Sequence, residues 1–182
     1  MTIEEILLHL KLDGWCVIDG VIPPDKVDAI RASVEATVAA DSKGPGGRVE
    51  GVGSTKGLIA VDQSFAPYLA DERIVAVTEA LFGPRVRVSF TTAIINNPGN
   101  DRGGWHADWP FNQRNAGHIP APYADAVIHL STLWMLSSFS PETGGTLVVP
   151  GSHRSDSNPT ADNGVDAHRP YPTEMQATGN AG

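Results

Sequence analysis

Cysteine is nearly absent from this chain. Cys16 is the single cysteine among 182 residues, so no disulfide can form within the chain. A protein without disulfides is typical of a reducing compartment, whereas small secreted domains use several of them. The apolar neighbours Trp15, Val17 and Ile18 indicate a buried core thiol rather than a reactive one.

Runs of positive charge and long apolar runs are also missing. The formal net charge is −8, and no cluster of Lys and Arg offers a surface for nucleic acid or anionic lipid. No apolar segment approaches the roughly 20 residues that span a bilayer. Acidic residues near the start, Glu4 and Glu5, interrupt any signal-peptide core. We therefore expect a cytoplasmic protein that binds neither nucleic acid nor membrane.

The length favours one domain over residues 1–182, with helices in its first half. Thr2 and Glu5 match a capping box before apolar residues at helical spacing. A second helix is expected from Pro24, with one apolar face of Val27, Ile30, Val34 and Val38. A third is expected over about 71–81, before Gly83 and Pro84.

Strand patterns dominate the later part of the chain. Apolar or alternating runs predict strands at 15–18, 86–95, 127–136 and 146–149, and the Gly-rich stretch 41–54 is expected to be a loop. Helices followed by strands, without βαβ alternation, predict an α+β chain with an antiparallel sandwich or barrel.

His106 and Asp108 form the most informative pair. Residues two apart on a strand project to the same side, so one imidazole and one carboxylate would converge on a point. These are two of the three ligands in the 2-His-1-carboxylate triad that binds non-haem Fe(II). Trp105 and Trp109 flank the pair and would supply dry aromatic walls. The alternative is a hydrogen-bonded surface pair.

Several motifs together resemble the phytanoyl-CoA dioxygenase family of Fe(II)- and 2-oxoglutarate-dependent oxygenases. They are Leu12-Asp13-Gly14-Trp15-Cys16-Val17-Ile18, Ile22-Pro23-Pro24-Asp25-Lys26-Val27, His106-Ala107-Asp108, Trp134 with Glu142-Thr143-Gly144-Gly145, and Pro150-Gly151-Ser152-His153. The last motif is the most distinctive, and the resemblance covers nearly the whole length.

The resemblance implies a double-stranded β-helix (a jelly roll, cupin-like) with N-terminal helices. His106 and Asp108 would hold Fe(II), and 2-oxoglutarate and O2 would complete the site. Trp134, Lys56 and Thr92 match positions that contact 2-oxoglutarate in the family. For Lys56 the alternative is a solvated loop charge, and for Trp134 it is core packing. Decarboxylation of 2-oxoglutarate to succinate would drive hydroxylation of a small molecule, with the protein supplying placement and exclusion of water.

Two family features have no counterpart in the sequence: the second iron-binding His and the Arg that pairs with 2-oxoglutarate. We interpret the chain as a domain truncated at its C-terminus. Within it, His153 and His168 are the alternative third ligands, with Arg154 or Arg169 as carboxylate partners, whereas His129 is expected in the core. A truncated β-helix would leave unpaired strand edges and exposed apolar faces, which predicts poor stability or association.

Substrate identity and oligomeric state are not readable from the sequence. Three residues just after His106 and Asp108, the metal pair, are expected to contact a small-molecule substrate: Trp109, Phe111 and Asn112. The main alternative function is a non-catalytic β-sandwich that binds a metal or a small molecule. A metal-dependent, cupin-like hydrolase or isomerase would use the same ligand types. Binding of 2-oxoglutarate through the metal separates these classes.

Overall fold

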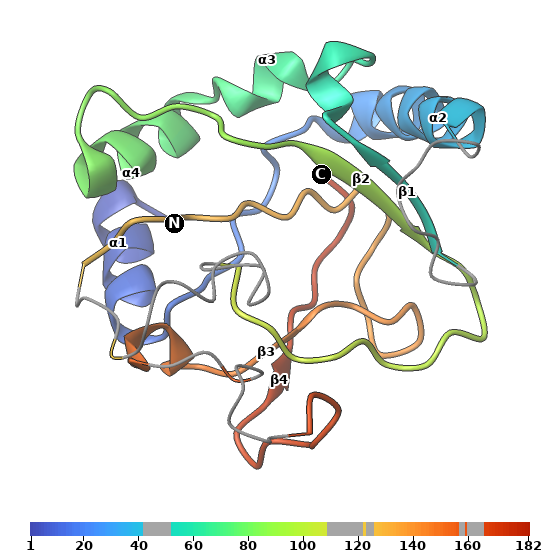
Figure 1. Ribbon diagram of the computed structural model, residues 1–182. Coiled ribbons are helices and arrows are strands. Elements are labelled where there is room, and N and C mark those ends of the chain that lie inside the picture. The colour runs from blue at the N-terminus through green and yellow to red at the C-terminus, as the bar shows by residue number, and fades with distance from the viewer. Residues whose placement is uncertain (42–51, 109–121, 123–125, 157–158, 160–165) are drawn as a thin grey trace.

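The computed structural model describes residues 1–41, 52–108, 122, 126–156, 159 and 166–182. Within these ranges the elements are α1 (Ile3–Leu12), α2 (Pro24–Asp41), β1 (Val52–Lys56), the 3-10 turn η1 (Leu58–Ala60), α3 (Ala66–Leu69), α4 (Glu72–Phe82), β2 (Thr92–Asn96), β3 (Leu147–Val148), η2 (Ser152–Arg154) and β4 (Met175–Gln176). In the view of Figure 1, α1 and α4 lie at the left and α3 and α2 along the top, β1 and β2 lie beside α2, and β3 and β4 lie in the lower half.

The three helices predicted from capping and periodicity are confirmed as α1, α2 and α4. At α1 the capping box forms in full: the Thr2 hydroxyl accepts from the Glu5 amide at 3.2 Å, and the Glu5 carboxylate accepts from the Thr2 amide at 2.8 Å. The four residues expected on the inner face of α2, Val27, Ile30, Val34 and Val38, are all buried. Local signals were sufficient here because capping and periodicity act within a few residues.

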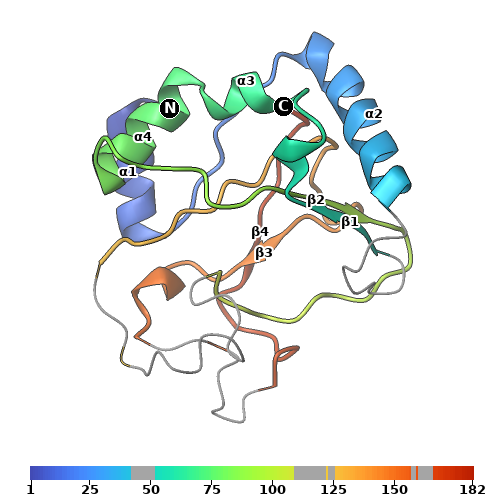
Figure 2. The ribbon, with the colours of Figure 1, turned by 45° about the horizontal axis from the view of Figure 1, so that its top comes forward.

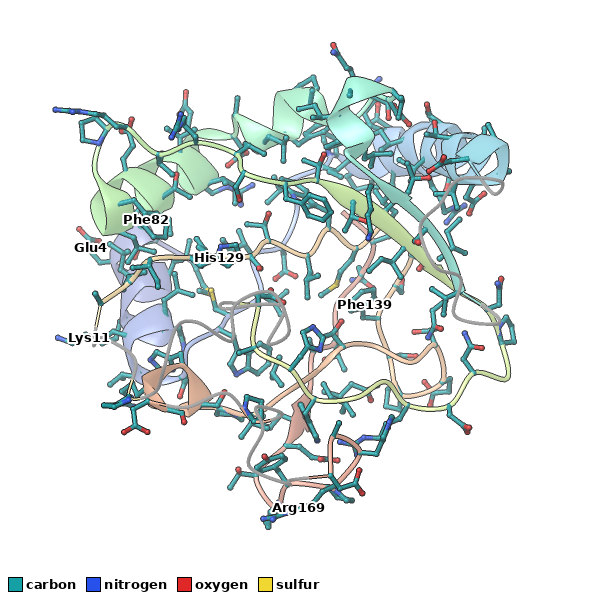
Figure 3. The ribbon with its side chains drawn as sticks, viewed as in Figure 1. Glu4, Lys11, Phe82, His129, Phe139 and Arg169 are labelled. Atoms are coloured by element: carbon teal, nitrogen blue, oxygen red, sulfur yellow. The ribbon has the colours of Figure 1, made fainter. Side chains whose placement is uncertain are left out.

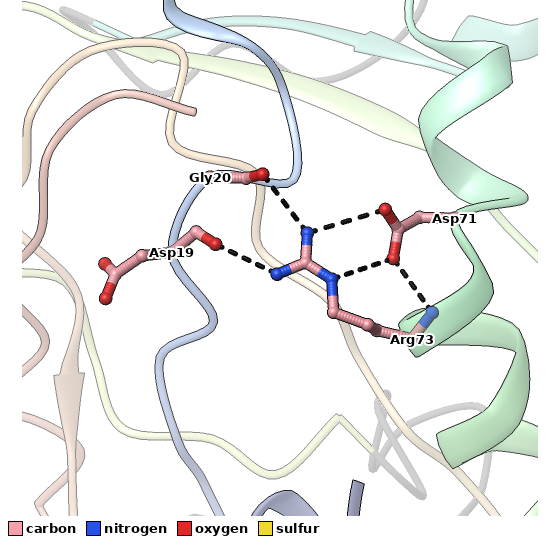
Figure 4. Close-up of polar contacts among 4 residues, drawn as sticks. All are labelled: Asp19, Gly20, Asp71 and Arg73. Carbon is pink, nitrogen blue, oxygen red and sulfur yellow. Dashed lines mark hydrogen bonds and ion pairs between the residues drawn. The ribbon is translucent and has the colours of Figure 1, made fainter. Parts of the chain in front are cut away.

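Helix α4 is fixed to the N-terminal segment by one arginine. The Asp71 carboxylate caps the helix by accepting from the Arg73 amide at 2.9 Å. The Arg73 guanidinium also contacts Asp71 and donates to the carbonyls of Asp19 and Gly20, each at 3.1 Å (Figure 4). This contact orients α4, which packs against α1.

The core lies between α2 and the β1–β2 pair (Figure 2). The residues that join the buried face of α2 there are Ile22, Leu58, Phe65 and Ala93. Trp134 and Leu136 pack against this cluster. Gly182 lies beside it, since its amide donates to the Met135 carbonyl and its carbonyl accepts from the Ile22 amide, both at 2.9 Å.

The strands are fewer and shorter than the sequence predicted. β1 pairs antiparallel with β2, from Val52 opposite Asn96 to Lys56 opposite Thr92, and β3 pairs with β4. The stretches 15–18 and 127–136 are not strands, 86–95 is a strand only from Thr92, and 146–149 is reduced to Leu147–Val148. The loop predicted at 41–54 is wrong for Asp41, which ends α2, and for 52–54, which belong to β1; residues 42–51 lie outside the described part.

The physical reason is that apolar alternation reports burial of one face, whereas a strand also needs a backbone partner. β1 contains Gly53 and Ser54, which have low strand propensity, and it is a strand because β2 lies alongside. The described residues thus form an α+β arrangement with two small sheets. No closed double-stranded β-helix is formed within them.

Large apolar side chains are exposed on the stretch that leads into and includes β2, and on the stretch 127–133, which forms no strand. They are Val86, Val88, Phe90 and Ile94 on one stretch, and Val127, Ile128 and Leu133 on the other. Phe90 is 59 % exposed and Leu133 is 62 % exposed. Exposed apolar residues concentrated on two neighbouring segments mark a surface suited to association.

None of the helices that the structure describes is both long and apolar enough to cross a bilayer.

Candidate metal centre

His106 and Asp108 lie close together, but the strand expected to carry them is not formed, because residues 101–108 have no strand partner. Their facing atoms, His106 Nε2 and Asp108 Oδ1, are 3.5 Å apart, and the side chains are 67 % and 51 % exposed. The other ring nitrogen, Nδ1, lies 3.1 Å from the Gly104 carbonyl oxygen. A carbonyl only accepts, so Nδ1 carries a proton. A histidine that donates from one nitrogen to a backbone carbonyl presents the other nitrogen as a metal ligand.

The distance fits a shared cation. Two ligand atoms about 2.1 Å from one metal ion lie about 3.0–3.4 Å apart at octahedral or tetrahedral angles, close to the 3.5 Å between His106 Nε2 and Asp108 Oδ1. Imidazole and carboxylate are also the donor types that Fe(II) takes in oxygenases. Within the described residues, however, no group of three or more His, Cys, Asp or Glu side chains could hold a metal ion. The donors present fit two positions of a facial triad.

The pair is electrostatically coupled. The hydrogen bond with Asp108, opposed by burial, raises the pKa of His106 above its usual 6.5. The same contact with His106, aided by the Ser131 hydroxyl and the nearby His129, holds the pKa of Asp108 down at about 2. Asp108 is therefore ionised at any physiological pH. A metal ion must displace the proton of His106, because only neutral imidazole is a ligand.

Sequence reasoning missed two further residues at this centre. The Ser131 hydroxyl donates to Asp108 Oδ2, and His129 Nε2 lies 3.2 Å from the Ser131 oxygen. The prediction that His129 is in the core is wrong, because its side chain is exposed. Its pairing with Ser131 is the same two-residue spacing that identified His106 and Asp108. The spacing was therefore a sequence signal for both pairs. The contact between the pair His129 and Ser131 and the pair His106 and Asp108 depends on the fold.

A network of side chains holds the segment that carries His106. Arg102 pairs with Glu174 through two hydrogen bonds, at 2.9 and 3.0 Å, and its guanidinium lies 5.0 Å from the centre of the Trp105 ring. Trp105 meets Tyr171 edge to face, at 5.5 Å between centroids. Its indole N–H donates to the Arg169 carbonyl at 2.8 Å. These contacts fix the backbone one to four residues before His106.

His153 is engaged elsewhere. Its Nε2 lies 3.2 Å from the Lys11 carbonyl, and the Arg154 guanidinium donates to the Leu12 carbonyl at 2.7 Å. Both basic side chains thus bind the carbonyls that end α1, where cations are favourable. Gly14 makes room for this contact, because a Cβ there would come within 2.3 Å of His153 Nδ1.

His168, the other alternative ligand, lies beside the metal-pair segment. A Cβ at Gly104 would come within 3.7 Å of its ring, and its backbone amide donates to the Asp166 carboxylate at 2.9 Å. The backbone on either side of it contacts Trp105, whose amide donates to the Ala167 carbonyl at 2.7 Å. Arg169 lies over Tyr171, with 5.6 Å from its guanidinium to the ring centre.

Comparisons with known proteins confirm the family resemblance of the sequence motifs. A protein-family model described as phytanoyl-CoA dioxygenase (PhyH) matches residues 10–178, nearly the whole chain. The chain belongs to the phytanoyl-CoA dioxygenase family. It is also 26 % identical over 161 residues to a protein of Aspergillus fumigatus named Dioxygenase af480. That match covers 85 % of this chain and 50 % of the relative, so the chain spans about half of the relative's length.

Two of the residues that resemble 2-oxoglutarate contacts of the family lie side by side. Lys56 on β1 is directly opposite Thr92 on β2, and both side chains are exposed. The neighbouring pair, Thr55 and Ala93, is buried, so Lys56 and Thr92 lie on the face turned away from α2. The Thr92 hydroxyl donates to the Thr55 carbonyl at 2.8 Å.

Trp134 is partly buried against the core, and its indole N–H donates to the Thr132 hydroxyl at 3.1 Å. It lies on the same segment as Ser131 and so connects the core to the metal pair. The residues expected to contact substrate, Trp109, Phe111 and Asn112, lie outside the described residues.

One cavity, of about 420 Å3, lies between α1 and the end of β3. Its lining includes His9, Asp13, Trp15 and Cys16. Burial raises the pKa of the Cys16 thiol, which disfavours the reactive thiolate. None of the residues predicted to bind metal or 2-oxoglutarate lines this cavity.

Proposed function

We propose that this chain is the metal-binding part of an Fe(II)- and 2-oxoglutarate-dependent dioxygenase that hydroxylates a small organic molecule. Membership of the phytanoyl-CoA dioxygenase family supports the proposal, as does the similarity to a protein named as a dioxygenase. The acidic charge and single cysteine are consistent with a cytoplasmic enzyme acting on a small molecule rather than on nucleic acid.

The proposal depends mainly on the geometry of His106 and Asp108. His106 Nε2 and Asp108 Oδ1 present a neutral donor and an anionic donor 3.5 Å apart, and both side chains are open to solvent. Fe(II) bound there with 2-oxoglutarate would supply the oxidising chemistry, coupled to release of succinate and CO2. The chain's own residues hold the metal and set its orientation, and Asp108 supplies a negative charge that persists at neutral pH.

Lys56 and Thr92 are the proposed contacts for 2-oxoglutarate. A lysine ammonium binds a carboxylate as a point charge. The Thr92 hydroxyl would add a hydrogen bond by turning its single proton from the Thr55 carbonyl to the carboxylate. Their side-by-side placement on the face away from α2 is what such a pair requires. Trp134, which is partly buried against the core, is proposed as a further contact for 2-oxoglutarate.

One observation favours a second candidate, a non-catalytic binder of metal or small molecules. No third His, Cys, Asp or Glu joins the pair in the described part of the chain. Two protein ligands hold a metal ion more weakly than three, so such a chain could bind a ligand without activating O2.

The test is spectroscopic and anaerobic. Fe(II) is added to the purified chain, then 2-oxoglutarate, and the visible metal-to-ligand charge-transfer band is recorded. We expect a band in the wild-type chain and none in His106→Ala. Fe(II) binding without a band, in a chain shown to be folded by circular dichroism, would favour the non-catalytic binder.

A further inference from the structure

We propose that Ser131, oriented by His129, determines which carboxylate oxygen of Asp108 faces the metal. The inference rests on the proposed function, because it assigns a positioning role within the same centre. Ser131 and His129 lie on a different segment from the metal pair, and Ser131 is 23 residues beyond Asp108.

The available donors and acceptors determine the direction of the hydrogen bonds that link His129, Ser131 and Asp108. A carboxylate only accepts hydrogen bonds, and Asp108 Oδ2 lies in hydrogen-bond contact with the Ser131 hydroxyl. The hydroxyl proton of Ser131 therefore goes to Asp108 Oδ2. A serine hydroxyl has one proton, so the contact of 3.2 Å between its oxygen and His129 Nε2 requires His129 to donate. The order is His129 to Ser131 to Asp108.

This order separates the two oxygens of Asp108. Oδ2 is engaged by Ser131, while Oδ1 lies 3.5 Å from His106 Nε2 and is the oxygen that faces the metal. A carboxylate held in this way binds through one oxygen. If both oxygens chelated the metal, they would occupy a coordination position that co-substrate or O2 requires. Ser131 thus keeps that position open.

The segment that carries Ser131 is anchored well enough for this role. Trp134 and Leu136, a few residues further on, pack against the core beneath α2. The Arg31 guanidinium reaches the Leu136 carbonyl at 3.5 Å, and the Met135 carbonyl accepts from Gly182 at 2.9 Å. Figure 3 shows His129 on this segment, which crosses the middle of the molecule toward Phe139. The core therefore sets the direction from which Ser131 approaches Asp108.

The experiment is an anaerobic Fe(II) titration by calorimetry of the full chain and its variants. Ser131→Ala should weaken Fe(II) binding about 10-fold or more, the effect typical of losing a partner of a metal ligand. Ser131→Thr keeps the hydroxyl and should restore affinity to within about 2-fold of wild type. The matched control is Ser137→Ala, the same exchange at an exposed serine further along the segment.

A double-mutant cycle of His129→Ala with Ser131→Ala tests the mechanism rather than the fold, and it keeps both metal ligands so that Fe(II) affinity stays measurable. If His129 acts through Ser131, His129→Ala should weaken Fe(II) binding in the wild-type chain and change it no further when added to Ser131→Ala. If the added substitution lowers Fe(II) affinity equally in both backgrounds of the cycle, or if Ser137→Ala lowers it as much as Ser131→Ala does, the substitutions destabilise the structure in general. Either result would overturn the inference. Wild-type affinity in Ser131→Ala would overturn it as well.

The same titration separates this inference from the proposed function. If Asp108→Ala binds Fe(II) as tightly as wild type, the metal centre itself is misplaced and the proposed function fails. If Asp108→Ala loses Fe(II) while Ser131→Ala keeps it, the centre stands and only the positioning role of Ser131 is rejected.

Discussion

Lys56 and Thr92 face each other across the β1–β2 pair, on the side opposite the buried pair Thr55 and Ala93. Each of the two residues resembles a different 2-oxoglutarate contact of the family. Their direct opposition places an ammonium and a hydroxyl within reach of one small anion, since opposite side chains have Cβ atoms about 5 Å apart.

We predict that Lys56→Ala weakens binding of 2-oxoglutarate to the Fe(II)-loaded chain about 10- to 100-fold, the worth of one charge-assisted hydrogen bond. Thr92→Val should cost less, because a neutral hydroxyl is lost. Anaerobic titration of 2-oxoglutarate measures both. The control is Lys26→Ala, an exposed lysine of α2 that pairs with Asp25. Unchanged affinity in Lys56→Ala would leave Lys56 a solvated strand residue.

His153→Ala should reduce stability and leave the metal centre intact. The variant loses the contact with the Lys11 carbonyl at the end of α1. For a hydrogen bond at an exposed site we expect up to about 1 kcal/mol, or about 2–4 °C in Tm. Thermal unfolding and Fe(II) titration are run on the same variant. A loss of Fe(II) affinity as large as in His106→Ala would instead make His153 the third ligand.

The affinity for Fe(II) should fall in acid. The pKa of His106 is raised above 6.5, and below that pKa its proton must leave before metal binds. Competition with one proton predicts a loss of about tenfold per pH unit below this pKa, while Asp108 stays ionised. Titrations across this range, with the His106 pKa located by NMR, test the slope. A flat profile would mean that His106 is not a ligand.

The stability of the metal-free chain depends on pH in the opposite direction to its affinity for Fe(II). The ion pair contributes stability below the usual His pKa of 6.5, and this contribution is lost as the pH rises through the raised pKa of His106. Since both side chains are more than half exposed, the effect on unfolding should be small.

We predict that the chain associates at raised concentration. Val88 and Phe90, on the segment before β2, are 62 % and 59 % exposed, and Leu133 is 62 % exposed. Light scattering during size-exclusion chromatography should show mass rising with concentration, and Val88→Lys with Phe90→Lys should shift the chain toward monomer. A monomer at every concentration with a sharp, reversible melt would contradict this.

How far the sequence could predict the structure depended on the range of each interaction. Thr2 and Glu5 cap α1 from three residues apart, and the buried face of α2 repeats every turn, so the helices followed from local pattern. His106 and Asp108 are close because they are two residues apart, although the strand on which that expectation rested is not formed. Ser131 reaches Asp108 across 23 residues and His153 reaches Lys11 across 142, and no spacing rule encodes such contacts. The strand lengths depended likewise on distant backbone partners.

The central claim is that His106 and Asp108 form the metal centre. Anaerobic titration of Fe(II) into the wild-type chain, His106→Ala, Asp108→Ala and His153→Ala tests it most directly. We predict a single Fe(II) site in the wild type, its loss in His106→Ala and Asp108→Ala, and its retention in His153→Ala. Equal Fe(II) binding by the wild type and the first two variants would contradict the account.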